Sequence, residues 1–327
     1  MHQRFDGSWA TLNTLPELPE VETIRKQLDP LLRACNIVEV WAFDSPKFTQ
    51  AHHALGCRLN GVRRRGKYLL VDLIDPDSPL DPLELIVHLG MTGLLSVSSN
   101  TASVTSLHSV EPNTRQQKQR SSWEQSATTN MAELSASAVG QTEAMRHLRA
   151  VWTLDDGRNL YFDDVRRFGR IAVVNAGDYQ SLATLAALGP EPFDSECTPE
   201  YLRKQINLSK RSVKAQLLAQ RLVAGLGNIY VDESLWRAQV HPAAKRITVL
   251  QSQRLCQAMS HVLQSAINNG GTTLRNYRDA EGASGTNQRY LDCYGRAGQS
   301  CTRCDTTLER IVIDARSTVF CPNCQRR

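Results

Sequence analysis

The sequence lacks a long uninterrupted run of apolar residues, and its first residues lack a hydrophobic segment. None of the apolar stretches in the 327 residues approaches the roughly 18 residues that a membrane-spanning helix needs. The opening MHQRFDGSWATLNT has no hydrophobic region of the kind that secretory signals carry. We therefore expect a cytoplasmic protein without a membrane partner.

Aromatic residues are also scarce, and the net charge is small. Aromatics make up 6% of the chain, but 41% of the residues are hydrophobic and 22% are charged, a balance that excludes wholesale disorder. The net charge of +5 hides an asymmetry: residues 1–199 hold 19 Lys and Arg against 24 Asp and Glu, whereas residues 200–327 hold 19 against 9. A basic C-terminal part is what a partner with a phosphate backbone requires.

Local patterns predict a short helix followed by β structure. Pro19 suits a first helical position, and apolar residues recur at helical spacing as far as about Pro30. Residues 36–94 and 149–175 alternate apolar and polar side chains between turn residues, which is typical of strands. The Asp-Gly pair at 156–157 indicates a hairpin inside the second stretch.

Between these stretches, residues 97–145 are rich in Ser, Thr and Gln and lack periodic aliphatic residues. We expect a flexible surface insertion there, because such a composition cannot bury enough apolar surface to order itself. The period then becomes helical, which predicts helices near residues 198–207, 211–222, 228–239 and 247–269. The third starts at a glycine-rich turn with Asn228 as the expected N-cap, so its free backbone N–H groups could bind a phosphate. A plain helix–helix turn is the alternative, and the basic surroundings favour the phosphate site.

Nine cysteines in a reducing compartment favour a metal site over a disulfide framework. Cys301 and Cys304 form one CxxC pair, Cys321 and Cys324 form a second, and sixteen residues separate the pairs. This spacing is typical of four-thiolate zinc sites, where two tight turns close a tetrahedron around one ion. We predict one structural zinc beside a hairpin over residues 308–320, and no organic cofactor. The other five cysteines are expected to be buried or partly buried thiols.

Eight short motifs occur in a fixed order between Pro16 and the cysteine pairs, namely PELPEVET, RRRGKYLL, HLGMTG, DVRRFG, LGPEP, GLGNIYVDESLW, GGTTL and YGRAG. This ordered set resembles the bacterial formamidopyrimidine-DNA glycosylases. The resemblance implies an α+β fold, in which a two-sheet β-sandwich with flanking helices precedes a helix–two-turns–helix domain and a zinc-finger β-hairpin. The implied limits are 16–190, 191–290 and 291–327, after a non-native or removed extension at 1–15.

The resemblance also implies an activity and the residues that perform it. Members of the family excise oxidised purines, such as 8-oxoguanine and formamidopyrimidines, from double-stranded DNA and then cut the abasic strand by β,δ-elimination. Pro16 matches the N-terminal nucleophile, whose secondary amine attacks C1′ of the sugar and forms a cationic iminium. Glu17 matches the acid that assists sugar-ring opening, and Lys67 matches the lysine that contacts the lesion and its phosphate.

Further positions match DNA contacts of the family, so we expect double-stranded DNA with oxidised bases as the partner of a monomeric protein. The residues that fill the void left by a flipped base correspond to Met91, Arg166 and Phe168. The positions that contact phosphates correspond to His88, Lys214, Asn228 and Arg316.

Four features depart from the family pattern. Val165 replaces a proline, which removes a constraint on its loop, and Ala219 replaces an aspartate. The loop at residues 279–290 lacks aromatic residues near Thr286, which leaves the lesion preference open. Leu15 precedes Pro16, and a proline nitrogen in an amide is no nucleophile, so we expect the active chain to begin at Pro16. Initiation at the leucine codon with Met, followed by Met removal, would produce that chain.

Three other hypotheses stay open from the sequence. The extension could block the nucleophile and leave a DNA-binding protein without catalysis. An endonuclease VIII-like enzyme for oxidised pyrimidines is the alternative within the same superfamily. A zinc-ribbon module that binds RNA is a third hypothesis, but it leaves the N-terminal half of the chain unexplained.

Overall fold

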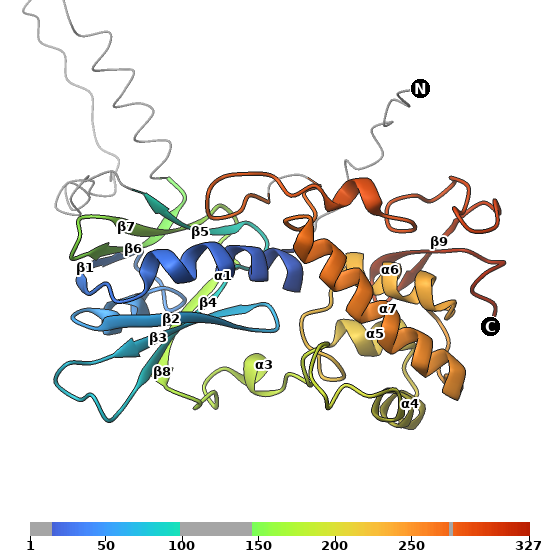
Figure 1. The fold of residues 1–327 in the computed structure, drawn as a ribbon, viewed down its shortest axis with the longest axis horizontal. Coiled ribbons are helices and arrows are strands. Elements are labelled where there is room, and N and C mark those ends of the chain that lie inside the picture. Colours follow the sequence, from blue (N-terminus) through green and yellow to red (C-terminus); the bar gives the residue numbers. More distant parts are fainter. Residues whose placement is uncertain (1–14, 99–145, 275–276) are drawn as a thin grey trace, which may run out of the picture.

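Two antiparallel sheets form a sandwich in the N-terminal half of the computed structural model, which describes residues 15–98, 146–274 and 277–327 (Figure 1). One four-stranded sheet has the order β1-β6-β7-β5, and the other has the order β2-β3-β4-β8. The strands are β1 (Ile37–Ala42), β2 (Arg58–Arg65), β3 (Tyr68–Ile74), β4 (Leu83–His88), β5 (Gly93–Ser98), β6 (Leu148–Leu154), β7 (Asn159–Asp164) and β8 (Arg170–Asn175). They lie where alternation of side chains predicted strands.

The predicted start of the insertion at residue 97 is wrong. Val97 and Ser98 belong to β5, where they pair with Leu160 and Asn159 of β7. Cross-strand pairing with β7 therefore continues the strand to Ser98, within the Ser-rich part of the sequence. The rest of the predicted insertion, residues 99–145, lies outside the described residues.

Two tight turns connect neighbouring strands of the sandwich. The predicted hairpin at 156–157 is confirmed, and Gly157 adopts the positive φ of 84° that such a turn requires. Arg65 and Tyr68 are opposite each other in β2 and β3, so Gly66 and Lys67 form a two-residue turn with φ of 58° at the glycine. Glycine at the first central position is the usual solution for such a turn. This turn places Lys67 at one end of the sandwich.

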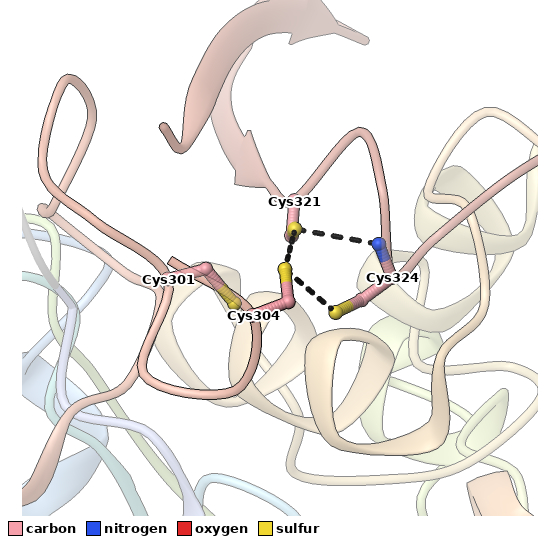
Figure 2. Close-up of side chains that lie close together, drawn as sticks. All are labelled: Cys301, Cys304, Cys321 and Cys324. Carbon is pink, nitrogen blue, oxygen red and sulfur yellow. Dashed lines mark hydrogen bonds between the residues drawn. The ribbon is translucent and has the colours of Figure 1, made fainter. Parts of the chain in front are cut away.

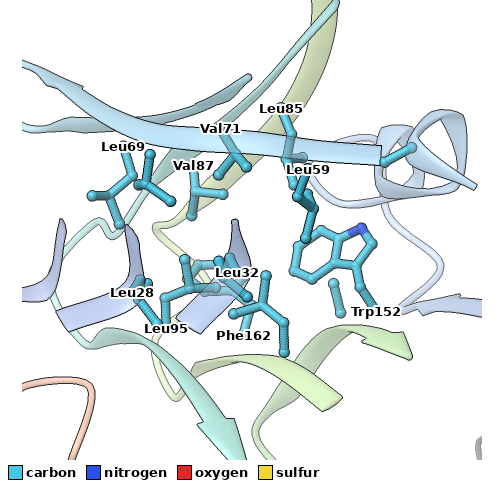
Figure 3. Packing of buried hydrophobic residues seen from close by; sticks show 14 of the residues in the cluster. Leu28, Leu32, Leu59, Leu69, Val71, Leu85, Val87, Leu95, Trp152 and Phe162 are labelled. Atoms are coloured by element: carbon cyan, nitrogen blue, oxygen red, sulfur yellow. The ribbon is translucent and has the colours of Figure 1, made fainter. Parts of the chain in front are cut away.

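Helix α1 (Leu18–Leu32) supplies one side of the sandwich core. Its buried apolar residues pack with residues from both sheets, such as Leu69 of β3 and Phe162 of β7 (Figure 3). The helix continues two residues past the predicted end at Pro30, and Leu32 at its end is fully buried. Burial of that leucine side chain stabilises the extra residues against the helix-breaking tendency of proline.

The second half of the chain is helical and has its own apolar core. Helices occur in all four predicted regions: α4 (Pro199–Leu208), α5 (Val213–Leu218), α6 (Asn228–Ala238) and α7 (Val249–Asn268). Helix α5 ends earlier than predicted, because Gln220 adopts a left-handed φ of 58° that no α-helix accepts. Gly227, not Asn228, is the N-cap of α6, so the predicted cap is one residue off. Leu18 of α1 belongs to this second core, which joins the two halves.

A C-terminal hairpin of β9 (Glu309–Ile313) and β10 (Arg316–Phe320) confirms the one predicted there. Asp314 and Ala315 form its two-residue turn, and both have positive φ. The short elements are η2 (Thr49–Ala54), α3 (Ala183–Ala186) and η4 (Asn287–Tyr290). The chain thus has the predicted α+β fold of a two-sheet sandwich, a helical region and a terminal hairpin. None of the helices in the described ranges combines the length and apolar character that a bilayer crossing requires.

Candidate active site

The carboxylate of Glu17 occupies the N-terminus of α6. The backbone N–H of Gly227 donates to Glu17 Oε2 at 2.6 Å, and that of Ile229 donates to Oε1 at 2.9 Å. A third, longer hydrogen bond comes from Tyr230 N–H at 3.4 Å. These are the N–H groups for which the sequence predicted a phosphate, and that prediction is wrong. A carboxylate of the chain itself is the anion at this helix start.

Lys67 faces the same carboxylate across Gly227. A Cβ on Gly227 would overlap the carboxyl carbon of Glu17 and would come within 2.7 Å of Lys67 Nζ. Both charged side chains are almost fully buried, with exposed fractions of 2% for Glu17 and 7% for Lys67. Only glycine leaves room for an acid and an amine to converge on this helix end.

Burial shifts both groups in opposite directions. It raises the pKa of Glu17, against the effect of the Lys67 charge and the three backbone N–H groups. It also lowers the pKa of Lys67, against the attraction of Glu17 and Glu20. An acid that more readily holds its proton and an amine that more readily loses one suit proton transfer near neutral pH.

Pro16 is buried next to this pair and is held by its neighbours along the chain. The N–H of Leu18 donates to Gly225 O at 3.0 Å, and the N–H of Glu17 donates to Glu20 Oε2 at 2.9 Å. The chain at Pro16 is therefore fixed from α1 and from the turn that precedes α6. Leu15, which is half-buried, is joined to the Pro16 nitrogen.

A buried hydrogen-bond network extends from Glu20 to Thr272 and Asn287, which follow α7 in the chain. Glu20 Oε1 accepts from the Tyr230 hydroxyl at 2.5 Å and from Thr272 N–H at 2.7 Å. The Thr272 hydroxyl lies 2.9 Å from both Tyr230 Oη and Asn287 Nδ2. Burial and the charge of Glu17 raise the pKa of Glu20 to about 7. Sequence reasoning missed this network, because its members lie far apart in the chain and share no local pattern.

Lys214 is a buried ion-pair partner, which contradicts its predicted phosphate contact. Its side chain is fully buried, and its ammonium lies 2.6 Å from Asp232 Oδ1 and 3.0 Å from Ser317 O. Asn228 Nδ2 donates to the same carbonyl at 3.0 Å. Two helices thus hold strand β10 through one backbone oxygen. The adjacent Arg316 is exposed, and its charge adds to the effect of burial that lowers the pKa of Lys67.

Two loops bring the three predicted void-filling residues to one place. Phe168 is 50% exposed, and the Arg166 guanidinium lies 4.9 Å from the centre of its ring. Gly90, with φ of 64°, packs so closely that a Cβ there would come within 2.5 Å of the backbone of Phe168 and Gly169. The turn that carries Met91 therefore rests directly on the loop of Phe168, and both are accessible at the surface.

His88, at the end of β4, is held as a neutral ring. Burial and the charge of Lys67 lower its pKa to about 4. Its Nδ1 accepts from Gly90 N–H at 3.2 Å, and its ring lies 4.6 Å from that of Tyr68. An imidazole with Nδ1 occupied in this way keeps its proton on Nε2, where it can serve as a hydrogen-bond donor.

The four terminal cysteines converge as the sequence predicted (Figure 2). Their sulfur atoms all lie within 4.8 Å of one another, and Cys324 Sγ is 3.3 Å from Cys304 Sγ. Zinc–thiolate bonds of about 2.3 Å in a tetrahedron separate the sulfurs by roughly 3.8 Å, so this set fits one zinc ion. With four protein ligands the ion is structural, and Trp236 of α6 packs against the cluster. The other five cysteines are buried or partly buried, as predicted.

Known proteins share this architecture along nearly the whole chain. Residues 15–171 match the formamidopyrimidine-DNA glycosylase N-terminal domain, residues 188–278 match the H2TH domain of the same enzymes, and residues 298–327 match the zinc finger found in FPG and IleRS. The formamidopyrimidine-DNA glycosylase of Deinococcus radiodurans is 38% identical over 95% of this chain and 97% of that relative. The chain belongs to the formamidopyrimidine-DNA glycosylase family.

Solved structures of the family agree with this assignment. The crystal structure of the MutM (Fpg) protein from Thermus thermophilus superposes with a TM-score of 0.74 at 36% identity, and covers 95% of this chain and 98% of its own. A Lactococcus lactis Fpg variant in complex with a Fapy-dG containing DNA gives a TM-score of 0.73 at 28% identity, with coverage of 95% and 100%. The protein is thus a DNA-binding DNA glycosylase of DNA repair with a structural zinc.

Proposed function

We propose that the chain, once it begins at Pro16, is a bifunctional DNA glycosylase and abasic-site lyase of base excision repair that removes oxidised purines. The observation that carries this proposal is the convergence of Glu17 and Lys67 at the start of α6, directly beside Pro16. Both charged groups come from the same chain, so we also propose that a monomer is the working species.

The first step is attack of the Pro16 secondary amine on C1′ of the damaged nucleotide. The glycosidic bond breaks, and the base leaves with the bonding electrons. The proton that the amine loses neutralises the departing base. Glu17 then donates a proton to the sugar ring oxygen as the bond between that oxygen and C1′ breaks. The result is a cationic iminium between Pro16 and the opened sugar.

Strand cleavage follows from the same cation. The iminium withdraws electrons and acidifies C2′, so loss of a proton there expels the phosphate on C3′. A second elimination expels the phosphate on C5′. Lys67 contributes a buried positive charge for the lesion phosphate, and its lowered pKa suits an amine that exchanges protons at this point.

The exposed side of the site faces the part of the DNA stack from which the base is flipped. Removal of a base from the stack leaves a void, and an apolar wedge with an arginine facing the orphaned cytosine offsets part of the unstacking cost. We assign this role to Met91, Arg166 and Phe168. Phosphates are assigned to Arg316, to the Nε2 proton of His88 and to the second amide proton of Asn228.

Excision from defined duplexes tests the proposal. Protein that begins at Pro16 should release 8-oxoguanine placed opposite cytosine and cleave the strand, whereas Glu17→Gln should abolish release. Glu200→Gln, which removes an exposed carboxylate on α4, is the matched control and should keep full activity. A duplex with an oxidised pyrimidine separates the alternative specificity: faster release of that base would assign the enzyme to oxidised pyrimidines. Binding without release of either base would replace the proposal by a DNA-binding protein without catalysis.

A further inference from the structure

The loop between β7 and β8 carries Arg166 and Phe168, and a buried carboxylate holds it from inside. Asp164 is fully buried. Its Oδ2 accepts from Gly169 N–H at 2.7 Å, and its Oδ1 accepts from the Thr92 hydroxyl at 2.6 Å and from Arg166 N–H at 3.2 Å. Asp164 thus ties both ends of the loop together, but none of these bonds reaches residue 167 in its middle.

Lys47 binds the same loop and the strand that follows it from the outside through two hydrogen bonds. Its ammonium donates to the backbone carbonyl of Arg167 at 2.8 Å, and its own carbonyl accepts from Ile171 N–H at 2.8 Å. One residue of the segment between β1 and η2 is therefore bound to the middle of the loop and to the strand that follows. Phe43, four residues earlier, lies 4.8 Å from the Arg167 guanidinium.

The middle of the loop needs such a restraint. Arg167 has a left-handed φ of 57°, which costs free energy for a residue with a side chain. Val165 is 55% exposed and has neither the fixed φ of a proline nor a packed side chain to hold it. A charged donor on the Arg167 carbonyl stabilises the peptide orientation that points Arg166 and Phe168 outward together.

We propose that Lys47 is a positioning residue for base excision, which presets the loop of Arg166 and Phe168 before DNA arrives. The proposal rests on the void-filling role given to these two residues above. Lys47 acts through the loop and touches no reacting atom. Its exposed ammonium is already committed to a carbonyl, so its charge is not one of the phosphate contacts that set the salt dependence of binding.

Three measurements on the full zinc-loaded protein test this role, with Lys47→Met as the variant and Lys47→Arg as its conservative partner. Hydrogen exchange of the free protein should be faster at Gly169 and Ile171 in Lys47→Met. Single-turnover release of 8-oxoguanine opposite cytosine should slow about tenfold, because misplaced contacts near a reacting centre reduce the rate strongly. Lys47→Arg should keep most of the exchange protection and most of the excision rate of the parent, since a guanidinium can donate to the same carbonyl. Lys204→Met, which removes an exposed lysine of α4, is the control for lost charge.

The salt dependence of DNA binding separates positioning from phosphate contact. The log–log salt slope of Lys47→Met should equal that of the parent, whereas a lost phosphate contact would reduce it by about one. An unchanged exchange pattern, an unchanged excision rate or a reduced slope would each overturn the proposal. If the parent protein itself releases no base, the proposed function fails, and hydrogen exchange still decides whether Lys47 holds the loop.

Discussion

The two sides of the active site are built in opposite ways. Glu17 and Lys67 are almost completely buried, and their positions are set by the backbone of α6 before any ligand binds. Phe168 and Arg166, by contrast, lie exposed on a loop that Asp164 holds from the inside and Lys47 from the outside. The difference indicates that the chemical groups are preorganised by the fold, whereas the groups assigned to the DNA stack acquire their main contacts only in the complex.

Among substitutions that compare the two sides without removing a reacting group, the largest effect is expected from Gly227→Ala on the buried side. The new Cβ would overlap Glu17 and crowd Lys67, so one of the two must move, and we expect excision to fall by about a thousandfold. Gly61→Ala is the matched control, because there the Cβ would meet the flexible end of Arg33 at 3.2 Å and Asp29 Oδ1 at 3.4 Å, both of which are side-chain atoms outside the active site. Single-turnover excision measures both variants. Retained activity in Gly227→Ala would show that the close approach is not needed.

Removal of the zinc ligands tests the finger, which the buried helix α6 supports. Cys321→Ser combined with Cys324→Ser should release the ion and strongly reduce DNA affinity, because a small zinc-bound domain does not keep its fold without the metal. The hairpin that carries Arg316 depends on the same cluster through the packing of Trp236. Cys256→Ser, a thiol outside the cluster, should bind zinc and DNA as the parent does. Full affinity of the double variant, with metal analysis showing no zinc, would contradict this role.

The smallest expected effect on DNA binding comes from the exposed cation Arg316, which we compare with the buried cation Lys214. Arg316→Ala should lower the salt slope of DNA binding by about one, because its exposed guanidinium is assigned to a phosphate. Lys214→Met should leave the slope unchanged and should instead lower the free energy of unfolding by about 3–5 kcal/mol, since it strands Asp232 without its partner. Salt titrations and urea denaturation measure the two quantities. A lower salt slope for folded Lys214→Met protein would show that Lys214 contacts a phosphate, against the structure.

The sequence predicted those features that depend on short spacing. Paired CxxC motifs located the zinc cluster, and the Asp-Gly pair located a hairpin, because in both cases the partners meet across a local turn. Helical periodicity placed α4 to α7 within a few residues, and the errors arose at ends such as α5, where a left-handed Gln220 stops the helix.

Long-range partners could not be predicted in the same way. No local pattern shows that Glu17 binds the N-terminus of α6 across 210 residues, so the sequence predicts a phosphate at this helix start instead. For Lys214 the phosphate contact was implied by the resemblance, and no pattern in the sequence indicates its ion pair with Asp232 on another helix. The domain limits, and the roles of Pro16, Glu17 and Lys67 in chemistry, stay predictions that rest on the resemblance and on the geometry of the site.

The central claim is that a free Pro16 amine acts beside the preorganised Glu17. Borohydride reduction of the protein mixed with an 8-oxoguanine duplex, followed by sequencing and mass analysis of the adduct, tests it most directly. We predict a chain that begins at Pro16, with the DNA sugar attached to the Pro16 nitrogen. An adduct on Lys67, or an adduct on a chain that begins at Met1, would contradict the claim, and so would no adduct from a chain that begins at Pro16.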